Sequence, residues 1–455
     1  MKSRVAILLF LLLSAQFCAA QQAPTKKEAA AENQDMSGMA MGQMQGMQMD
    51  HDQSMDMQPQ NFIQDILRHD TSGTSAQPDS TPVPMLMTKR DQWTLMFHAN
   101  VFVLDQQETG PRAADKFFST NWIMGMAQHR LGRGIFTVRT MLSLEPATVT
   151  DRQYPLLFQQ GETAFGNAIV DGQHPHNLFM EIGFLYDLKL GADSLLSFYF
   201  APVGDPAIGP LAFPHRASAA EDPVAPLGHH QEDSTHIAED VISSGFTYRM
   251  VRIEASGFHG REPDEYRWDI DQGAVDSWSL RLTLQPGKNW SGQYSYARIA
   301  SPEALFPGED QERMTASVMY NHPLRGGNWA NTLLWGRTRG LQDNSVFNSY
   351  LFESTLNFNN LNYVWTRIES PERSNELLLG ASPLPPNFDE RSIGRVQAYT
   401  FGYDRDIDVV PHLASAIGAQ FSAYGVPGTL QSTYGPHPFS VAIFFRLRPY
   451  AGETR

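Results

Sequence analysis

The sequence predicts an all-β protein: a transmembrane, outer-membrane β-barrel of about sixteen antiparallel strands that follows a disordered N-terminal arm. Three observations lead to this prediction. From Trp93 onward, apolar and polar residues alternate with a period of two, as in strands with one apolar face. The connections between these segments are alternately short and long. Charged residues make up only 18% of the 455 residues, against about 25% in soluble domains, as expected if one face of each strand meets lipid.

Residues 1–20 have the features of a secretory signal peptide. Lys2 and Arg4 precede an apolar run of nine residues, which is too short to cross a bilayer because a spanning helix needs about 20 residues. Small residues at Cys18 and Ala20 fit cleavage after Ala20. This cleavage removes the only cysteine, so disulfides and Cys-based metal sites are excluded. In the alternative, Cys18 is lipidated and becomes the N-terminus of the mature chain.

Residues 21–90 are expected to form a disordered arm in the periplasm. They are rich in Gln, Ala, Asp, Ser and Pro and show no sustained period. Such a composition buries too little apolar area to offset the entropy of ordering the chain. A short helix over residues 62–68 is the one element predicted in this arm.

A methionine-rich stretch within the arm, residues 36–57, contains no Leu, Ile, Val or Phe. Thioether sulfur is a soft ligand that selects Cu(I) over hard ions. The histidine of this stretch, which lies between two aspartates, adds an imidazole for Cu(II). The alternative is a tail that binds no metal. The predicted copper ligands here are Met36, Met39, Met41, Met44, Met47, Met49, His51, Met55 and Met57.

The barrel, residues 91–455, is predicted from its alternating segments. The clearest example is Trp278-Ser-Leu-Arg-Leu-Thr-Leu-Gln285, in which every second residue is apolar. We expect the apolar face to meet lipid and the polar face to line a lumen, because a ring of sixteen strands is wide enough for water. The predicted strands centre on residues 93–104, 116–130, 134–145, 177–190, 194–203, 240–250, 251–259, 278–285, 290–299, 312–321, 328–338, 347–358, 361–369, 394–405, 411–424 and 438–448.

The connections give the orientation of the predicted barrel. Those after even-numbered strands are short, whereas most of those after odd-numbered strands are long, including 146–176, 204–239 and 370–393. Outer-membrane barrels have short periplasmic turns and longer outside loops. Three tryptophans, Trp93, Trp290 and Trp329, begin strands at the predicted periplasmic end, where an aromatic girdle belongs.

Histidines concentrate in two long loops that are predicted to lie outside the membrane. These loops could also fold inward and constrict the pore. Neutral imidazoles together with carboxylates suit copper(II), zinc or nickel. The alternative is that these histidines are solvated or hydrogen-bond to neighbouring loops. The predicted loop ligands are His174 and His176 in the first loop, and His229, His230 and His236 in the second.

Several functions are excluded or left without support. The net charge of −15 argues against a nucleic-acid partner. The sequence lacks Gly-x-Ser-x-Gly and phosphate-binding glycine loops, and no spacing selects a nucleophile, so we do not expect an enzyme.

The chain consists of a signal peptide, then a Met/Asp/His-rich arm and then a barrel. In this layout it resembles the CopB/PcoB copper-resistance outer-membrane proteins. The Met-x-x-Met and Met-Asp-His elements of residues 35–57 carry this resemblance, and the barrel contributes no matching motif. It implies a protein that sequesters or exports copper, with outer-membrane lipid, metal ions and periplasmic copper-handling proteins as partners. The alternatives are a general diffusion porin with an incidental arm, or a structural or surface-loop barrel.

Overall fold

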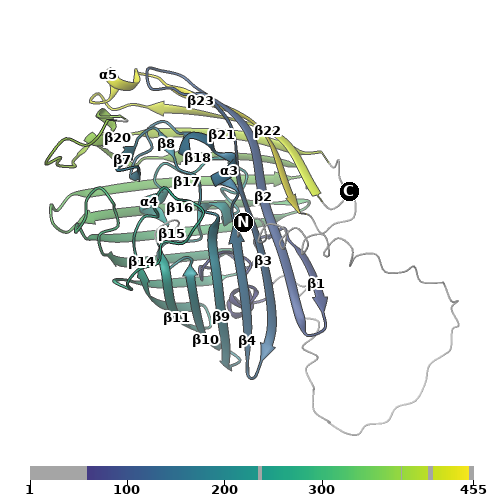
Figure 1. Cartoon of the computed structure of the whole chain (residues 1–455). Helices are drawn as coiled ribbons and strands as arrows, with labels where there is room; N and C mark the ends of the chain where they lie inside the picture. The colour runs from purple at the N-terminus through teal and green to yellow at the C-terminus, as the bar shows by residue number, and fades with distance from the viewer. Residues whose placement is uncertain (1–58, 234–237, 381, 408–412, 450–455) are drawn as a thin grey trace, which may run out of the picture. The chain divides into compact units, whose positions relative to one another are not determined.

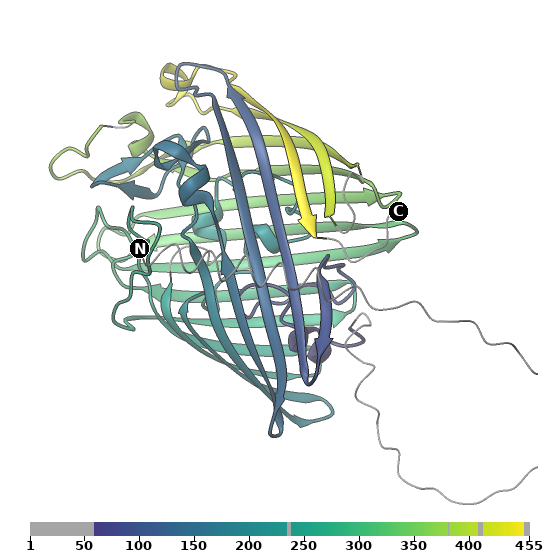
Figure 2. The ribbon, with the colours of Figure 1, turned by 45° about the vertical axis from the view of Figure 1, so that its right-hand side comes forward.

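The protein is a closed antiparallel β-barrel of sixteen strands, as the sequence predicts (Figure 1). The computed structural model describes residues 59–233, 238–380, 382–407 and 413–449. The last strand pairs with the first, with Val101 opposite Leu447, and Figure 2 shows this seam between the yellow and the purple-blue strands. The barrel strands are β2 (Trp93–Glu108), β3 (Lys116–Leu131), β4 (Gly134–Leu142), β9 (Phe179–Gly191), β10 (Ser194–Val203), β11 (Glu239–Tyr248), β12 (Val251–His259), β13 (Ser277–Gly287), β14 (Trp290–Ile299), β15 (Gln311–Leu324), β16 (Gly327–Gly340), β17 (Val346–Phe358), β18 (Asn362–Glu369), β21 (Gln397–Asp406), β22 (Leu413–Gly425) and β23 (Phe439–Pro449).

Every predicted strand corresponds to one barrel strand. The largest shift of a strand start is at β21, predicted from residue 394 but beginning at Gln397, because β20 (Ser392–Arg395) pairs with β19 (Glu372–Ser374) instead. The remaining short elements are β1 (Leu86–Arg90), β5 (Tyr154–Pro155), β6 (Glu162–Ala164), β7 (Asn167–Ile169), β8 (Gly172–Gln173), α2 (Phe62–Arg68), α3 (Glu145–Thr148), α4 (His229–Glu232), α5 (Gln431–Tyr434), η2 (Thr150–Arg152), η3 (Phe213–His215) and η4 (Asn375–Leu378).

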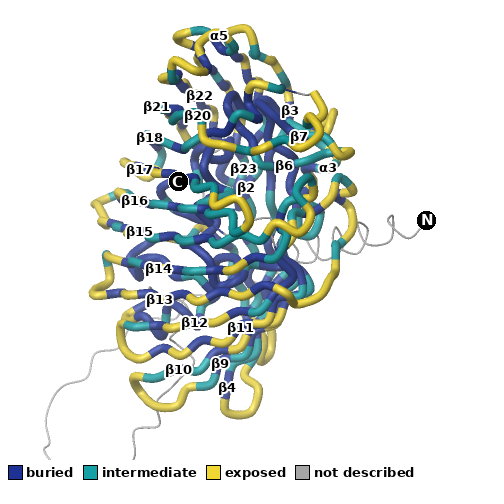
Figure 3. Tube along the Cα trace, turned by 90° about the vertical axis from the view of Figure 1, so that its left-hand side faces the viewer, coloured by how far each residue is buried: buried dark blue, intermediate teal, exposed yellow. Residues whose placement is uncertain are grey.

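The outer face of the barrel is apolar and the inner face is polar. Along β13, Leu280 and Leu282 are 48% and 39% exposed, whereas the alternate residues Arg281 and Thr283 are buried. Figure 3 shows the same alternation of buried and exposed residues along neighbouring strands. A closed ring with an apolar outside is one of the two structures that satisfy every backbone group within a bilayer, so this is an outer-membrane barrel. Among the described residues, no helix is long and apolar enough to cross a membrane.

The two ends of the barrel differ, as the connections predict. At one end, short turns join β3 to β4, β13 to β14, β15 to β16 and β17 to β18; we call it the short-turn end. The long connections gather at the other, which we call the long-loop end. Trp93, Trp290 and Trp329 are all exposed near the short-turn end, and the Trp290 ring lies 4.4 Å from that of Tyr320. Their placement fits an interfacial aromatic girdle.

The prediction that residues 21–90 are disordered throughout is wrong for residues 59–90. The predicted helix is present as α2, and its apolar face packs against the buried Leu195 of the wall. Asn61 caps it, because its side-chain oxygen accepts a hydrogen bond from the Gln64 N–H at 3.1 Å. After this segment, β1 pairs with the first residues of β2. Contacts with the barrel wall supply the order that the composition alone could not.

Candidate functional site

The lumen is crossed by the long connection between β10 and β11. We call its described part, residues 204–233, the lumen loop. Its Gly209 N–H donates to Ser295 Oγ on β14 at 2.9 Å, and its Ala220 carbonyl accepts from Asn100 Nδ2 on β2 at 2.8 Å. These two strands are eight positions apart in a ring of sixteen, so the loop spans the lumen from wall to wall. The expectation that a long loop folds inward is therefore confirmed for this one.

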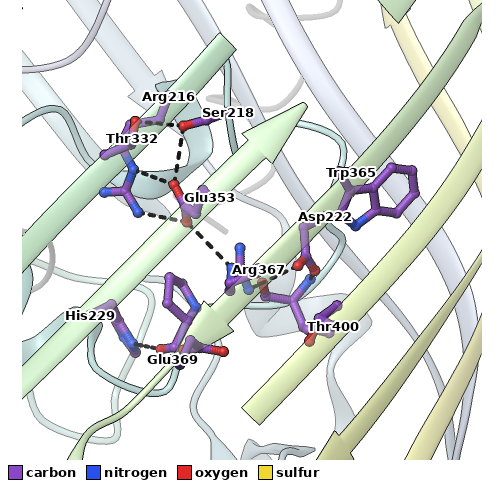
Figure 4. A network of polar contacts seen from close by, with 12 residues as sticks. Arg216, Ser218, Asp222, His229, Thr332, Glu353, Trp365, Arg367, Glu369 and Thr400 are labelled. Carbon is purple, nitrogen blue, oxygen red and sulfur yellow. Dashed lines mark hydrogen bonds and ion pairs between the residues drawn. The ribbon is translucent and has the colours of Figure 1, made fainter. Parts of the chain in front are cut away.

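Buried ion pairs hold the lumen loop to the wall (Figure 4). Arg216 makes a two-pronged contact with Glu353 on β17, with Nε–Oε2 and Nη2–Oε1 distances of 3.0 Å. Arg367 on β18 contacts the other side of Glu353 at 3.3 Å and the loop residue Asp222 at 3.0 Å. Ser218 Oγ donates to Glu353 Oε2 at 3.2 Å. Glu353 thus joins the loop to two strands, in a triad without solvent contact.

A second group of ion pairs holds the same loop to the seam of the barrel. Glu221 pairs with Arg448 at 2.8 Å and also with Arg446, both on β23. Arg446 further contacts Asp404 on β21 at 3.1 Å. The sequence predicts charges of both signs inside the strands, but only the structure reveals that the loop supplies many of their partners.

Residues 59–85, the N-terminal segment, occupy the lumen at the short-turn end. The guanidinium of Arg139 on β4 is paired with Glu181 at 2.7 Å and donates to the His69 carbonyl at 3.0 Å. Farther along the segment, the side chain of Asn321 on β15 donates to the Ser80 carbonyl at 2.8 Å. Strands β4 and β15 are seven positions apart in the ring, so this segment also crosses the lumen.

A Glu-His-His cluster lies among the long loops. Glu162 begins β6, His174 follows β8, and His230 lies in α4 of the lumen loop. The Nε2 atoms of both histidines approach the same carboxylate oxygen, Glu162 Oε1, at 2.7 and 2.8 Å. Glu162 and His174 are buried, and His230 is nearly so. The other oxygen of Glu162, Oε2, lies 3.6 Å from Arg267.

Burial and the neighbouring charges set the protonation states in this cluster. Burial raises the pKa of Glu162, but His174 and His230 outweigh it and hold the pKa of that carboxyl well below its usual range. Burial, followed by the charge of Arg267, lowers the pKa of His174 to about 4, against the opposing effect of Glu162. Neutral imidazole and ionised carboxylate are the forms of these side chains that bind metal ions.

The structure separates the predicted loop ligands. His174 and His230 meet at Glu162, whereas His176 pairs with Glu145 at 2.8 Å and belongs to a different contact. His229 donates from Nδ1 to the Pro226 carbonyl at 2.7 Å, with its ring 3.9 Å from that of His230. His236 lies outside the described residues, as do all predicted ligands of the arm: Met36, Met39, Met41, Met44, Met47, Met49, His51, Met55 and Met57.

Glu162 is the member of this cluster that the sequence prediction left out. It lies in the same polar loop as His174, twelve positions earlier, but one carboxylate among many in the loops carries no special signal. Its role depends on a third residue, His230, that is 68 positions away. Only the folding of the lumen loop against the first long connection brings the three together.

Comparisons with known proteins give the following results. No protein-family model and no curated protein matches the chain. Among solved structures, it is similar to the anion-selective porin from Comamonas acidovorans, with 11% identity over 78% of this chain and 99% of that one and a TM-score of 0.45. It is also similar to Salmonella typhi OmpF in complex with daunomycin (8% identity, 79% and 100% covered, TM-score 0.46) and to Pseudomonas putida OprB (7%, 78% and 94%, 0.46). The strand pairing of this chain itself establishes its fold.

Proposed function

We propose that the protein is a narrowed, selective channel for small hydrophilic solutes across the outer membrane. The main support is the lumen loop, which crosses a polar lumen, is hydrogen-bonded to strands on opposite sides of the ring and is held by buried ion pairs to β17, β18 and β23. Sixteen strands enclose more space than the inward side chains fill, and loops are one means by which barrels restrict such a lumen. A barrel with a purely mechanical role has no use for this arrangement.

The proposed orientation places the short turns and the N-terminal segment in the periplasm and the long loops outside, as in other outer-membrane barrels. In this orientation a solute from outside meets an acidic region first. Glu376 is buried and Glu262 and Glu303 are half-buried within the long loops. Clustered carboxylates attract cations into a cleft, so we expect the pore to prefer cations.

Single-channel recording in planar bilayers tests this proposal. The full chain should give small, cation-selective conductance steps, visible as a shifted reversal potential in a salt gradient. Deletion of residues 59–85 should enlarge the steps because it removes one of the two segments across the lumen. Deletion of residues 21–53 is the matched control and should leave the steps unchanged. Absence of steps from both the full chain and the 59–85 deletion would refute a channel.

Copper handling is the second candidate, and the methionine-rich residues 35–57 favour it. In this proposal the arm binds Cu(I) in the periplasm, receives it from periplasmic copper-handling proteins, and the barrel sequesters or exports it, as the resemblance to the CopB/PcoB proteins implies. Deletion of residues 35–57 should lower the copper tolerance of the cell and the copper content of the purified protein. If copper tolerance and copper content are both unchanged, the copper proposal is wrong and only the channel proposal remains. That the chain is not an enzyme stays a prediction.

A further inference from the structure

We propose that Glu162, His174 and His230 bind a divalent transition-metal ion, such as zinc(II), at the long-loop end of the lumen. The proposal is independent of whether the barrel conducts. One potential ligand atom from each of the three side chains lies within 4.8 Å of the others. Two imidazoles and one carboxylate form a ligand set that suits zinc(II), copper(II) or nickel(II), whereas calcium and magnesium prefer oxygen alone.

The tautomer of His174 directs a lone pair at this site. Its Nδ1 lies 2.7 Å from the Pro175 carbonyl oxygen, and a carbonyl can only accept, so Nδ1 carries the proton. In the neutral ring Nε2 then bears the lone pair, and this atom faces Glu162 Oε1 at 2.7 Å. Two acceptors in such close contact repel each other unless a cation or a proton lies between them. A backbone carbonyl on the distal nitrogen is also the usual outer partner of a metal-bound histidine.

The spacing is close to what an ion requires. Two ligands of a tetrahedral ion with bonds of about 2.1 Å lie about 3.4 Å apart, whereas both imidazoles lie 2.7–2.8 Å from Glu162 Oε1. A side-chain movement of about half an ångström or slightly more therefore opens the cluster enough. The amide of Gln159 lies 3.5 Å from His230 Nδ1, and by turning its oxygen toward that atom it can fix the required tautomer of His230.

The surrounding charges favour a divalent cation. Arg267, 3.6 Å from Glu162 Oε2, supplies one positive charge, and it also donates to Asn177 at 3.2 Å. The carboxylate of Glu162 balances this charge. The nearby Glu262 has a pKa that is raised well above its usual range by burial and then by the charge of Glu162, and a bound dication would allow it to ionise.

Zinc(II) titration of the full chain in detergent tests the site, because every variant compared keeps all potential ligands of the arm. Glu162→Gln and His174→Gln should each weaken one zinc site at least tenfold. His176→Gln is the matched control because it changes the same His-Pro-His sequence at a residue outside the cluster, and it should leave this affinity unchanged. If Glu162→Gln and His174→Gln bind zinc like the wild type, the proposal is wrong.

A spectroscopic measurement guards against variants that bind poorly because they are misfolded. Variants enter the comparison only if they keep the heat-dependent gel mobility of a folded barrel. Copper(II) bound to the wild type should show hyperfine coupling to two imidazole nitrogens at this site in electron paramagnetic resonance. His230→Gln should lose one of them and His176→Gln neither. An identical spectrum for wild type and His230→Gln would overturn the assignment.

Discussion

Replacement of Glu353 by glutamine tests whether buried ion pairs hold the lumen loop in place. Glu353 is fully buried, accepts hydrogen bonds from Arg216 through both oxygens and from Ser218, and forms an ion pair with Arg367 at 3.3 Å. Loss of one partner of a buried ion pair costs about 3–5 kcal/mol, since the remaining charge stays in a poorly solvated place. Asp233 and Asp222 remain as partners for the two arginines, so we expect the lower value, about 3 kcal/mol.

A cost of this size should appear as local opening of the loop, because the backbone pairing between barrel strands is untouched. With 1.36 kcal/mol for each factor of ten, the amides of residues 216–224 should exchange about a hundredfold faster. Hydrogen exchange followed by mass spectrometry measures this change. Glu312→Gln on β15 is the control: its partner Arg339 is 3.5 Å away and partly exposed, so its loss costs at most about 1 kcal/mol. Equal exchange in wild type and Glu353→Gln would refute the reasoning.

Three further predictions concern the loops, the lipid face and the N-terminal segment. The pKa values of Glu162 and His174 are both lowered in the folded protein. Acidification from pH 7 toward 4 should therefore loosen the first long connection. The protection of its amides from hydrogen exchange, corrected for the pH dependence of the intrinsic exchange rate, should fall. Higher protection at low pH would contradict this. Leu282→Arg on the lipid face should cost about 2–4 kcal/mol in folding titrations with vesicles, whereas Leu324→Arg at the short-turn end should cost at most about 1 kcal/mol. Deletion of residues 59–85 should lower the thermal stability of the barrel, since Arg139 and Asn321 lose hydrogen-bond partners; an unchanged melting temperature would refute this.

The strands could be predicted from the sequence because each records its surroundings locally. A residue such as Leu282 meets lipid and its neighbour Thr283 meets the lumen, so a period of two is imposed along every strand. The turns are equally local. Asn359 and Asn360 adopt φ values of 54° and 53°, in the left-handed region that asparagine tolerates better than most residues.

The contents of the lumen could not be predicted in this way. Residues 71–75, Thr-Ser-Gly-Thr-Ser, have the composition of a flexible linker, yet Thr74 accepts a hydrogen bond from Arg281, 207 positions away. Arg216 and Glu353 are separated by 137 positions. No periodic pattern encodes such partners, because a polar segment becomes ordered here only when the polar wall of a closed barrel surrounds it.

The filling of the lumen follows from the size of the barrel and gives its two ends different chemistry. Sixteen strands leave an interior too wide for wall side chains to meet, while the wall directs many arginines and carboxylates inward that are costly to leave unpaired. Segments that enter from each end supply the partners. At the short-turn end these are largely backbone carbonyls, such as those of His69 and Ser80, which are themselves uncharged. At the long-loop end they are carboxylates and imidazoles. A cation that enters from the long-loop end therefore meets carboxylate and imidazole ligands before it reaches the N-terminal segment, an order that suits capture followed by restricted passage.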